Sequence, residues 1–291
     1  MLLKRILTAI VLATLAISAI FYLPTLLFYL FIGIIILMAA WEWAGLIGLH
    51  KISRKLMFLF ILIVPMLGVT FFTQILELLS RVLDNPDLKK QSGALEWLVI
   101  GPVIFWVFMT FAIKRAPQGL LDLKVKESYK IFIGWFLLLS AWMFLVKLKA
   151  YYGAEAALYF LLLIWVADIS AFFVGKKFGK DKLAPAISPG KTIQGLYGAL
   201  FSGLICSVLL VLYYGYPLMI ASDFIMLSLL TVLISIYGDL FFSLVKRQSG
   251  VKDSGSLLPG HGGVLDRIDS VIAAAPFYYA GIILIGRSVY S

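Results

Sequence analysis

Long apolar runs alternate with short polar segments along almost the whole chain. A helix that crosses a bilayer needs about 20 mostly apolar residues, with a range of roughly 17–25. By that criterion the pattern predicts nine spans, at residues 3–22, 25–43, 56–76, 97–113, 130–146, 156–174, 192–214, 218–243 and 268–287. The sequence therefore predicts an all-α, polytopic integral membrane protein of about nine transmembrane helices.

Composition excludes a soluble fold. Hydrophobic residues make up 62% of the 291 residues and charged residues 14%, whereas soluble domains carry about 25% charged residues. Cys206 is the single cysteine, so the chain has no intramolecular disulfide and a thiolate metal site is not expected. Lys4 and Arg5 precede the first apolar run as in a signal peptide, but no A-x-A site follows and Pro24 leads into the next run. We interpret residues 3–22 as the first span.

The 25 basic residues divide unevenly between the two sides of this map. One side holds 19 of them, at the N-terminus and in loops 44–55, 114–130, 175–191 and 244–267, and the other side holds 6. Because Lys and Arg are enriched in cytoplasmic loops, the N-terminus is predicted to be cytoplasmic and the C-terminus external. The net charge of +10 is thus a sign of topology, and of attraction to anionic headgroups, rather than of nucleic-acid binding. We expect the bacterial inner (cell) membrane as the location.

The most polar segment of the chain, residues 243–270, lies between the last two spans. Charge held at a membrane edge indicates a functional site. Asp266 and Asp269 are three residues apart and share one face of a helix, and Asp239 lies near the end of the preceding span. If the last two spans pack together, the three carboxylates converge and repel one another unless a cation intervenes. We therefore predict that Asp239, Asp266 and Asp269 hold Mg²⁺ or Mn²⁺.

The same segment carries cations suited to phosphate, namely Lys246, Arg247, Lys252 and Arg267. Carboxylates for a hard cation and cations for phosphate are what chemistry on a nucleoside triphosphate requires. A lone histidine is more often structural than catalytic. His261, however, lies beside Gly262 and Gly263, between the basic cluster and the aspartate pair. This position makes it a candidate hydrogen-bond donor to a phosphate, or a proton shuttle.

A second polar loop, 175–191, ends in Ser188-Pro189-Gly190-Lys191-Thr192 at the start of a span. A turn there delivers a lysine and a hydroxyl to a helix N-terminus, which favours anions. The GxxxxGK[ST] spacing of a P-loop is absent, so the signal is weak by itself. Asp168 and Glu42 also lie near cytoplasmic span ends. We expect Glu42, between Trp41 and Trp43, to pair with a nearby lysine and only to anchor its helix.

Together these motifs resemble a known family. The polar run is similar to the signature of phosphatidate cytidylyltransferases (CDP-diacylglycerol synthases), through Ser243-x-x-Lys246-Arg247-x4-Lys252-Asp253 and Leu258-Pro259-Gly260-His261-Gly262-Gly263-x-x-Asp266-Arg267-x-Asp269. Gly238-Asp239, Ser188-Pro189-x-Lys191-Thr192, and Asp168 followed by Ser170 and Ala171 also look like that family. The motifs fall in residues 151–291, interpreted as the catalytic region. Residues 1–150, about five spans, match in hydropathy and length alone.

The resemblance implies that CTP and phosphatidic acid react to CDP-diacylglycerol and pyrophosphate, with a divalent metal and with room for a second, monovalent cation such as K⁺. It implies a homodimer and a metal centre at Asp239, Asp266 and Asp269. Catalytic roles follow for these aspartates and for Lys246, Arg247, Lys252, His261 and Arg267. Substrate-binding roles follow for Asp168, Ser188, Lys191, Thr192, Ser243, Gly262 and Gly263. One departure is Gln194, where the family usually has Glu, which indicates a hydrogen-bonding or packing role.

Two other classes of function stay open at this stage. A cation-coupled transporter would use the aspartates as its ion site, but it predicts charges at the midplane and related halves, and we find no internal repeat. A CTP-dependent polyprenol or dolichol kinase shares the chemistry of CTP and metal at a membrane edge. The complete series of motifs fits the cytidylyltransferase better.

Overall fold

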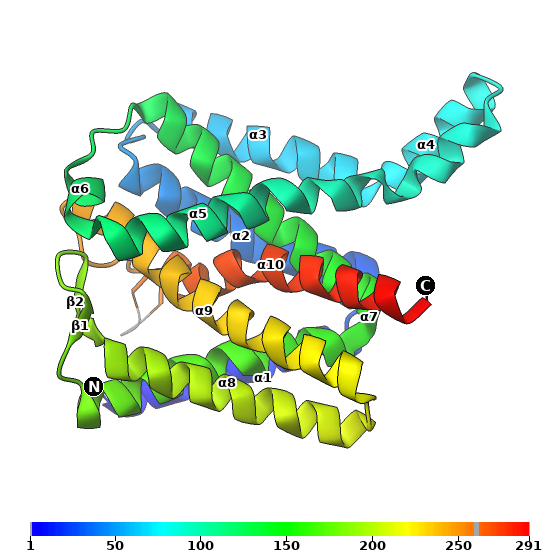
Figure 1. Ribbon diagram of the computed structural model, residues 1–291. Helices are drawn as coiled ribbons and strands as arrows, with labels where there is room; N and C mark the ends of the chain where they lie inside the picture. The colour runs from blue at the N-terminus through cyan, green and yellow to red at the C-terminus, as the bar shows by residue number, and fades with distance from the viewer. Residues whose placement is uncertain (1, 259–261, 291) are drawn as a thin grey trace.

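A computed structural model of the chain describes residues 2–258 and 262–290. They form a bundle of long helices with one small β-hairpin (Figure 1). The elements in order are α1 (Leu2–Tyr22), α2 (Thr25–Leu46), α3 (Ile52–Thr70), α4 (Phe72–Val82), the 3-10 helix η1 (Pro86–Val99), α5 (Ile100–Arg115), α6 (Pro117–Asp122), α7 (Glu127–Phe178), β1 (Lys182–Ala184), β2 (Ser188–Thr192), α8 (Ile193–Tyr214), α9 (Leu218–Gln248) and α10 (Leu265–Tyr290). The predicted all-α, polytopic membrane architecture is confirmed.

Within the described residues, seven helical segments are long and apolar enough to cross a membrane. One of them, α7, contains two predicted spans, because its backbone leaves helical geometry at Gly153, where φ is 86°. A positive φ is costly for residues with a side chain, so glycine suits this break. Helix α1 has 21 residues, Leu2–Tyr22, and within the described side chains its part Ile10–Tyr22 is apolar. The count of nine spans therefore stays a prediction.

One predicted boundary was wrong, because the run at 56–76 breaks at Phe71, where α3 ends and α4 begins. The run at 97–113 lies within Pro86–Arg115, a segment long and apolar enough to cross a membrane, in which α5 begins at Ile100. Helices α4 and η1 pack against each other and project from the bundle (Figure 1). Hydropathy alone did not separate the amphipathic helix α4 from α3 before it.

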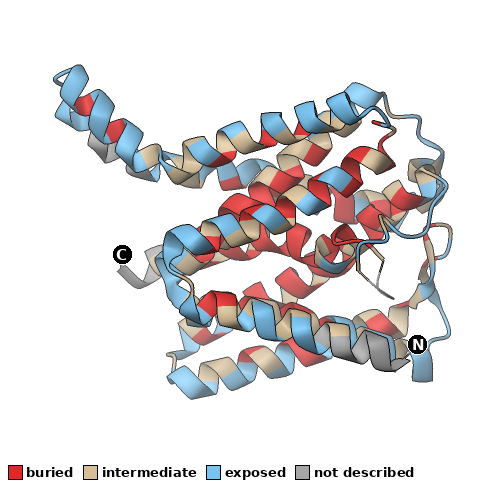
Figure 2. Cartoon of the chain, turned by 180° about the vertical axis from the view of Figure 1, so that it is seen from behind, coloured by how far each residue is buried: buried red, intermediate tan, exposed pale blue. Residues whose placement is uncertain are grey.

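The polar loops gather at one end of the bundle, at the left of Figure 1. That end carries the β-hairpin, α6 and the segment between α9 and α10, whereas α10 ends at the other side (Figure 1). Buried residues lie along the inward faces of the helices, and exposed ones lie on the outside (Figure 2). Many of the exposed side chains are large and apolar, such as Phe60, Phe108 and Phe201, as expected for surfaces in contact with lipid.

The last two long helices, α9 and α10, pack closely along each other, as the convergence of the aspartates requires. Gly238 makes this approach tight, since a Cβ atom there would overlap Ala273 and would lie 3.5 Å from the carbonyl oxygen of Asp269. One turn further along α9, Phe241 stacks on Trp43 of α2 and meets Trp106 of α5 edge to face. The absence of a side chain at Gly238 thus brings Asp239 next to the α10 backbone.

Candidate active site

A cavity of about 1410 Å³ opens between α1, α2, α7, α8, the β-hairpin, α9 and α10. Its long wall is apolar, with residues such as Leu12, Phe28 and Phe160 from α1, α2 and α7. Its polar end is charged and is lined by Asp168, Lys191, Asp239, Asp266, Arg267 and Asp269. Ser188 and Thr192 also line it. Residues that the sequence predicted from four separate segments thus meet at one cavity.

Asp239, near the C-terminal end of α9, forms an ion pair with Lys191. Lys191 Nζ lies 2.7 Å from Asp239 Oδ2, and both side chains are partly exposed to the cavity. Lys191 also donates to the carbonyl oxygen of Ile236 at 3.3 Å, and Ser243 Oγ donates to Asp239 Oδ1 at 3.3 Å. The β-hairpin is thereby attached to α9 at the charged end of the cavity.

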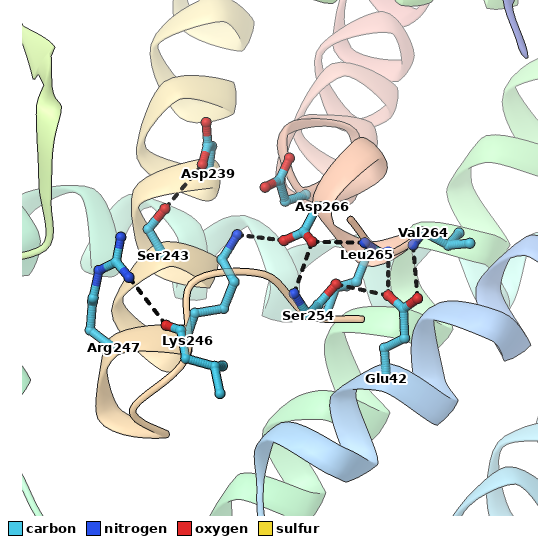
Figure 3. Close-up of polar contacts among 12 residues, drawn as sticks. Glu42, Asp239, Ser243, Lys246, Arg247, Ser254, Val264, Leu265 and Asp266 are labelled. Atoms are coloured by element: carbon cyan, nitrogen blue, oxygen red, sulfur yellow. Dashed lines mark hydrogen bonds and ion pairs between the residues drawn. The ribbon is translucent and has the colours of Figure 1, made fainter. Parts of the chain in front are cut away.

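Asp266, in the first turn of α10, has partners on both of its oxygens (Figure 3). Lys246 Nζ donates to Oδ1 at 2.6 Å, and both side chains are largely buried. The backbone N–H groups of Ser254 and Gly263 donate to Oδ2 at 2.8 and 3.0 Å. Asp266 therefore binds the backbone of the segment before α10, and it also carries charge at the cavity.

Asp269 lies one turn further along α10 and is buried, with 7% of its surface exposed. Its Oδ1 accepts from the backbone N–H of Ser270 at 2.9 Å. The Ser270 hydroxyl is a hydrogen-bond partner of Asp168. The negative charge of Asp239 repels the carboxylates of both Asp168 and Asp269. Three helices, α7, α9 and α10, therefore each direct a carboxylate to the same charged region.

The donor chemistry of this region fits a hard cation, since carboxylate oxygens are the ligands that Mg²⁺ and Ca²⁺ prefer. In the described part of the chain, no three His, Cys, Asp or Glu side chains are gathered closely enough to form a metal site. Asp239 is paired with Lys191 and Asp266 with Lys246. The assignment of Asp239, Asp266 and Asp269 to a metal stays a prediction.

The β-hairpin places Lys191 at the cavity, and its last residue is the N-cap of α8. Strands β1 and β2 pair antiparallel, with Lys182 opposite Thr192 and Ala184 opposite Ser188. Thr192 is the N-cap of α8, and its Oγ1 accepts from the N–H of Gly195 at 3.1 Å. A hydroxyl at this position satisfies one of the free amides of the first helical turn. In this structure Thr192 is thus a helix cap, next to the cavity-lining Lys191.

Arg247 and Lys252, for which the family resemblance implied catalytic roles, do not line the cavity. Arg247 Nε donates to the carbonyl oxygen of Ile187 at 3.3 Å, and a second guanidinium nitrogen donates to that of Val251 at 3.2 Å. Arg247 therefore joins the hairpin loop to the segment after α9. Lys252 is exposed on that segment. Arg267 is exposed and lines the cavity.

Comparison with known proteins identifies the family. A model of the cytidylyltransferase family matches residues 3–285. The chain is 37% identical over 281 residues to a phosphatidate cytidylyltransferase of Pseudomonas aeruginosa, with 96% of each chain covered. It is 34% identical over 288 residues to one of Haemophilus influenzae, covering 96% of this chain and 97% of that one. A phosphatidate cytidylyltransferase of Bacillus subtilis is 43% identical over 131 residues, which cover 44% of this chain and 47% of that one.

The chain belongs to the cytidylyltransferase family. The resemblance drawn from the motifs is confirmed, and it extends to the N-terminal half, because the matches to the two full-length relatives cover 96% of the chain.

Gln194, the departure from the usual family pattern, has a hydrogen-bonding role. Its Oε1 accepts from the backbone N–H groups of Lys180 and Asp181 at 3.0 and 3.2 Å, and its Nε2 donates to Asp181 Oδ2 at 2.9 Å. A glutamate could accept the two amide bonds but could not donate to Asp181. The pair of Gln194 and Asp181 thus joins the ends of the loop that carries the hairpin.

The glycine-rich turn of the family signature is described in part. His261 lies outside the described residues. On either side of it, the N–H of Leu258 donates to the carbonyl oxygen of Gly262 at 2.9 Å, and Gly262 has a φ of 82°. Gly263 donates to Asp266. In this structure Gly262 and Gly263 shape the backbone that enters α10.

The expectation for Glu42 was wrong. Glu42 is 8% exposed, and its carboxylate accepts from the backbone N–H groups of Val264 and Leu265 and from Ser254 Oγ, rather than from a lysine (Figure 3). These partners lie more than 200 residues further along the chain. No local pattern around Glu42 indicated them, because the contact exists only once α2 packs beside the start of α10.

Proposed function

We propose that this protein transfers the cytidylyl group of CTP to phosphatidic acid, giving CDP-diacylglycerol and pyrophosphate. The observation that carries the proposal is the cavity, which has a long apolar wall and a charged end in one space. Phosphatidic acid has the matching form, two acyl chains and one phosphate monoester. The family match over 3–285 and the names of the full-length relatives support the same reaction.

In the proposed reaction, a phosphate oxygen of phosphatidic acid attacks the α-phosphorus of CTP. A new P–O bond forms, the bond between the α-phosphorus and its bridging oxygen breaks, and pyrophosphate leaves with that oxygen. Because the attacking oxygen is already anionic, the reaction needs little help from a general base. The enzyme must instead neutralise charge and align the two phosphates.

The side chains available for that work are the cations at the charged end of the cavity. Lys191 and Arg267 line this end of the cavity. Lys246 does not line it but forms an ion pair with Asp266, which does. We assign Arg267 to the triphosphate and Lys191 to either substrate. Lys191 is paired with Asp239 in the protein alone, so the positive and negative charges offset each other at the membrane edge. An incoming phosphate would compete with Asp239 for Lys191.

We propose that Mg²⁺ or Mn²⁺ is held by Asp239 and Asp269, with Asp266 as the third carboxylate. A bound divalent ion neutralises phosphate charge and orients the phosphates. Asp266 is the least available of the three, because both of its oxygens have protein partners. A second, monovalent cation, a homodimer, a cytoplasmic active site and the inner-membrane location remain part of the proposal.

The test is product formation by the purified protein in detergent with Mg²⁺, phosphatidic acid and CTP. CTP labelled in the cytidine ring should give a labelled lipid, and CTP labelled in the γ-phosphate should give labelled pyrophosphate and no labelled lipid. A polyprenol or dolichol kinase would give the opposite result with its lipid. Reactions without phosphatidic acid, and an Asp269→Asn variant, are the controls. No cytidine in the lipid fraction under these conditions would refute the proposal.

A further inference from the structure

Glu42 caps α10 from a different helix. The N–H groups of Val264 and Leu265 donate to Oε1 and Oε2 of Glu42, each at 2.9 Å. These amides belong to the start of α10, where the first N–H groups have no partner inside the helix. A carboxylate there satisfies two of them and also faces the positive end of the helix dipole. The N-terminal half of the chain therefore fixes where α10 begins.

The contact extends from Glu42 to the charged cavity through one serine. Ser254 Oγ donates to Glu42 Oε2 at 2.8 Å, while its backbone N–H donates to Asp266 Oδ2 at 2.8 Å (Figure 3). Asp266 in turn accepts from Lys246. Ser254 is thus held between two carboxylates, one on α2 and one on α10. Glu42 itself does not line the cavity.

From this arrangement we infer that Glu42 is a positioning residue for the proposed cytidylyl transfer. It sets the first turn of α10, and so it sets the direction of Asp266 and Asp269 toward the cavity. The inference rests on the proposed function, in which these aspartates serve the phosphates and their metal. Residues that orient metal ligands without touching the metal typically change affinity or activity by about 10- to 100-fold when replaced.

The first experiment measures the cap directly, without metal or substrate. Glu42→Gln keeps the size of the side chain but replaces one acceptor oxygen with an N–H₂ donor. We expect faster hydrogen–deuterium exchange over residues 262–270 in this variant than in the wild-type protein. Glu127→Gln is the matched control, because Glu127 is an exposed residue whose carboxylate pairs with Arg54 at the same end of the bundle. Unchanged exchange over 262–270 in Glu42→Gln would overturn the inference.

The second experiment separates positioning from simple stabilisation. In detergent-purified, monodisperse Glu42→Gln, kcat should fall by about 10- to 100-fold and the Mg²⁺ concentration for half-maximal activity should rise, while KM for phosphatidic acid changes little. Ser254→Ala should shift both quantities in the same direction but less. Because the two residues share one hydrogen bond, the losses in the double variant should not add. A merely structural role would lower the yield or the melting temperature and leave the Mg²⁺ dependence of the folded protein unchanged.

The outcomes distinguish this inference from the proposed function. If Glu42→Gln keeps kcat and the Mg²⁺ dependence of the wild type within about twofold, below the range expected for a positioning residue, the positioning role is refuted. If the wild-type protein makes no CDP-diacylglycerol, the proposed function fails, and the exchange experiment still decides whether Glu42 caps α10.

Discussion

Lys191 and Asp239 form an ion pair across the charged end of the cavity, with Nζ and Oδ2 2.7 Å apart. Lys191 belongs to the short hairpin before α8, and Asp239 belongs to α9. The pair places the ammonium group of Lys191, which can bind a phosphate, beside one of the carboxylates that we assign to a metal.

Replacing Lys191 should therefore weaken catalysis more than it weakens the fold. A hydrogen bond to a charged group contributes about 1.5–3 kcal/mol, so Lys191→Ala should lower kcat/KM by roughly ten- to a hundredfold. Steady-state kinetics with CTP and phosphatidic acid varied in turn will show which substrate depends on it. Lys180→Ala, an exposed lysine of the same loop, is the control and should behave as wild type. Equal kinetics for the two variants would contradict the role of Lys191.

Asp266→Asn should abolish turnover and lower the melting temperature, while the protein still folds. The substitution keeps the shape of the side chain, removes the negative charge and leaves the largely buried Lys246 without its ion-pair partner. Removing one member of a buried pair is costly because a charge is left unpaired. The measurement is CDP-diacylglycerol formation over a range of Mg²⁺ concentrations, with gel filtration in detergent to check folding. Asp122→Asn, an exposed residue at the end of α6, is the control. Wild-type turnover by Asp266→Asn at low Mg²⁺ would show that Asp266 is not needed for the metal.

Gln194 offers a test of the hairpin without touching charge at the cavity. Gln194→Ala removes the acceptor for the amides of Lys180 and Asp181, and each such bond contributes about 0.5–1.5 kcal/mol. Gln194→Glu keeps that acceptor, loses the donation to Asp181 and places a second carboxylate beside Asp181, a like-charge contact that solvent screens at this exposed position. We expect Gln194→Ala to lower the melting temperature and the activity more than Gln194→Glu does. The reverse order, measured by thermal unfolding in detergent and by CTP turnover, would contradict this account.

The orientation in the membrane follows from the distribution of lysine and arginine. With 19 basic residues on one side and 6 on the other, the polar loops should face the cytoplasm and the C-terminus should be external. A C-terminal alkaline phosphatase fusion should be active and a green fluorescent protein fusion dark. A fusion at residue 50, in a loop of the opposite side, is the internal control and should give the opposite pattern. A fluorescent C-terminal fusion would require a different number of spans.

The sequence by itself determined the class of the protein, because hydropathy and the asymmetry of basic residues are properties of composition along the chain. It also identified the family, since Lys246, Asp266 and Asp269 lie within one short segment with fixed spacing. The packing of α9 on α10 was the condition under which the aspartates would converge, and the structure shows that packing.

Only the tertiary structure decided the partners of these side chains. Asp239 and Asp266 each have a lysine partner, Arg247 binds backbone carbonyl groups, and Gln194 binds Asp181. The cap of α10 by Glu42 joins residues more than 200 positions apart. Such contacts depend on which helix faces pack together. A local pattern of polar and apolar residues indicates where most of the long helices lie along the chain, but it does not fix their neighbours.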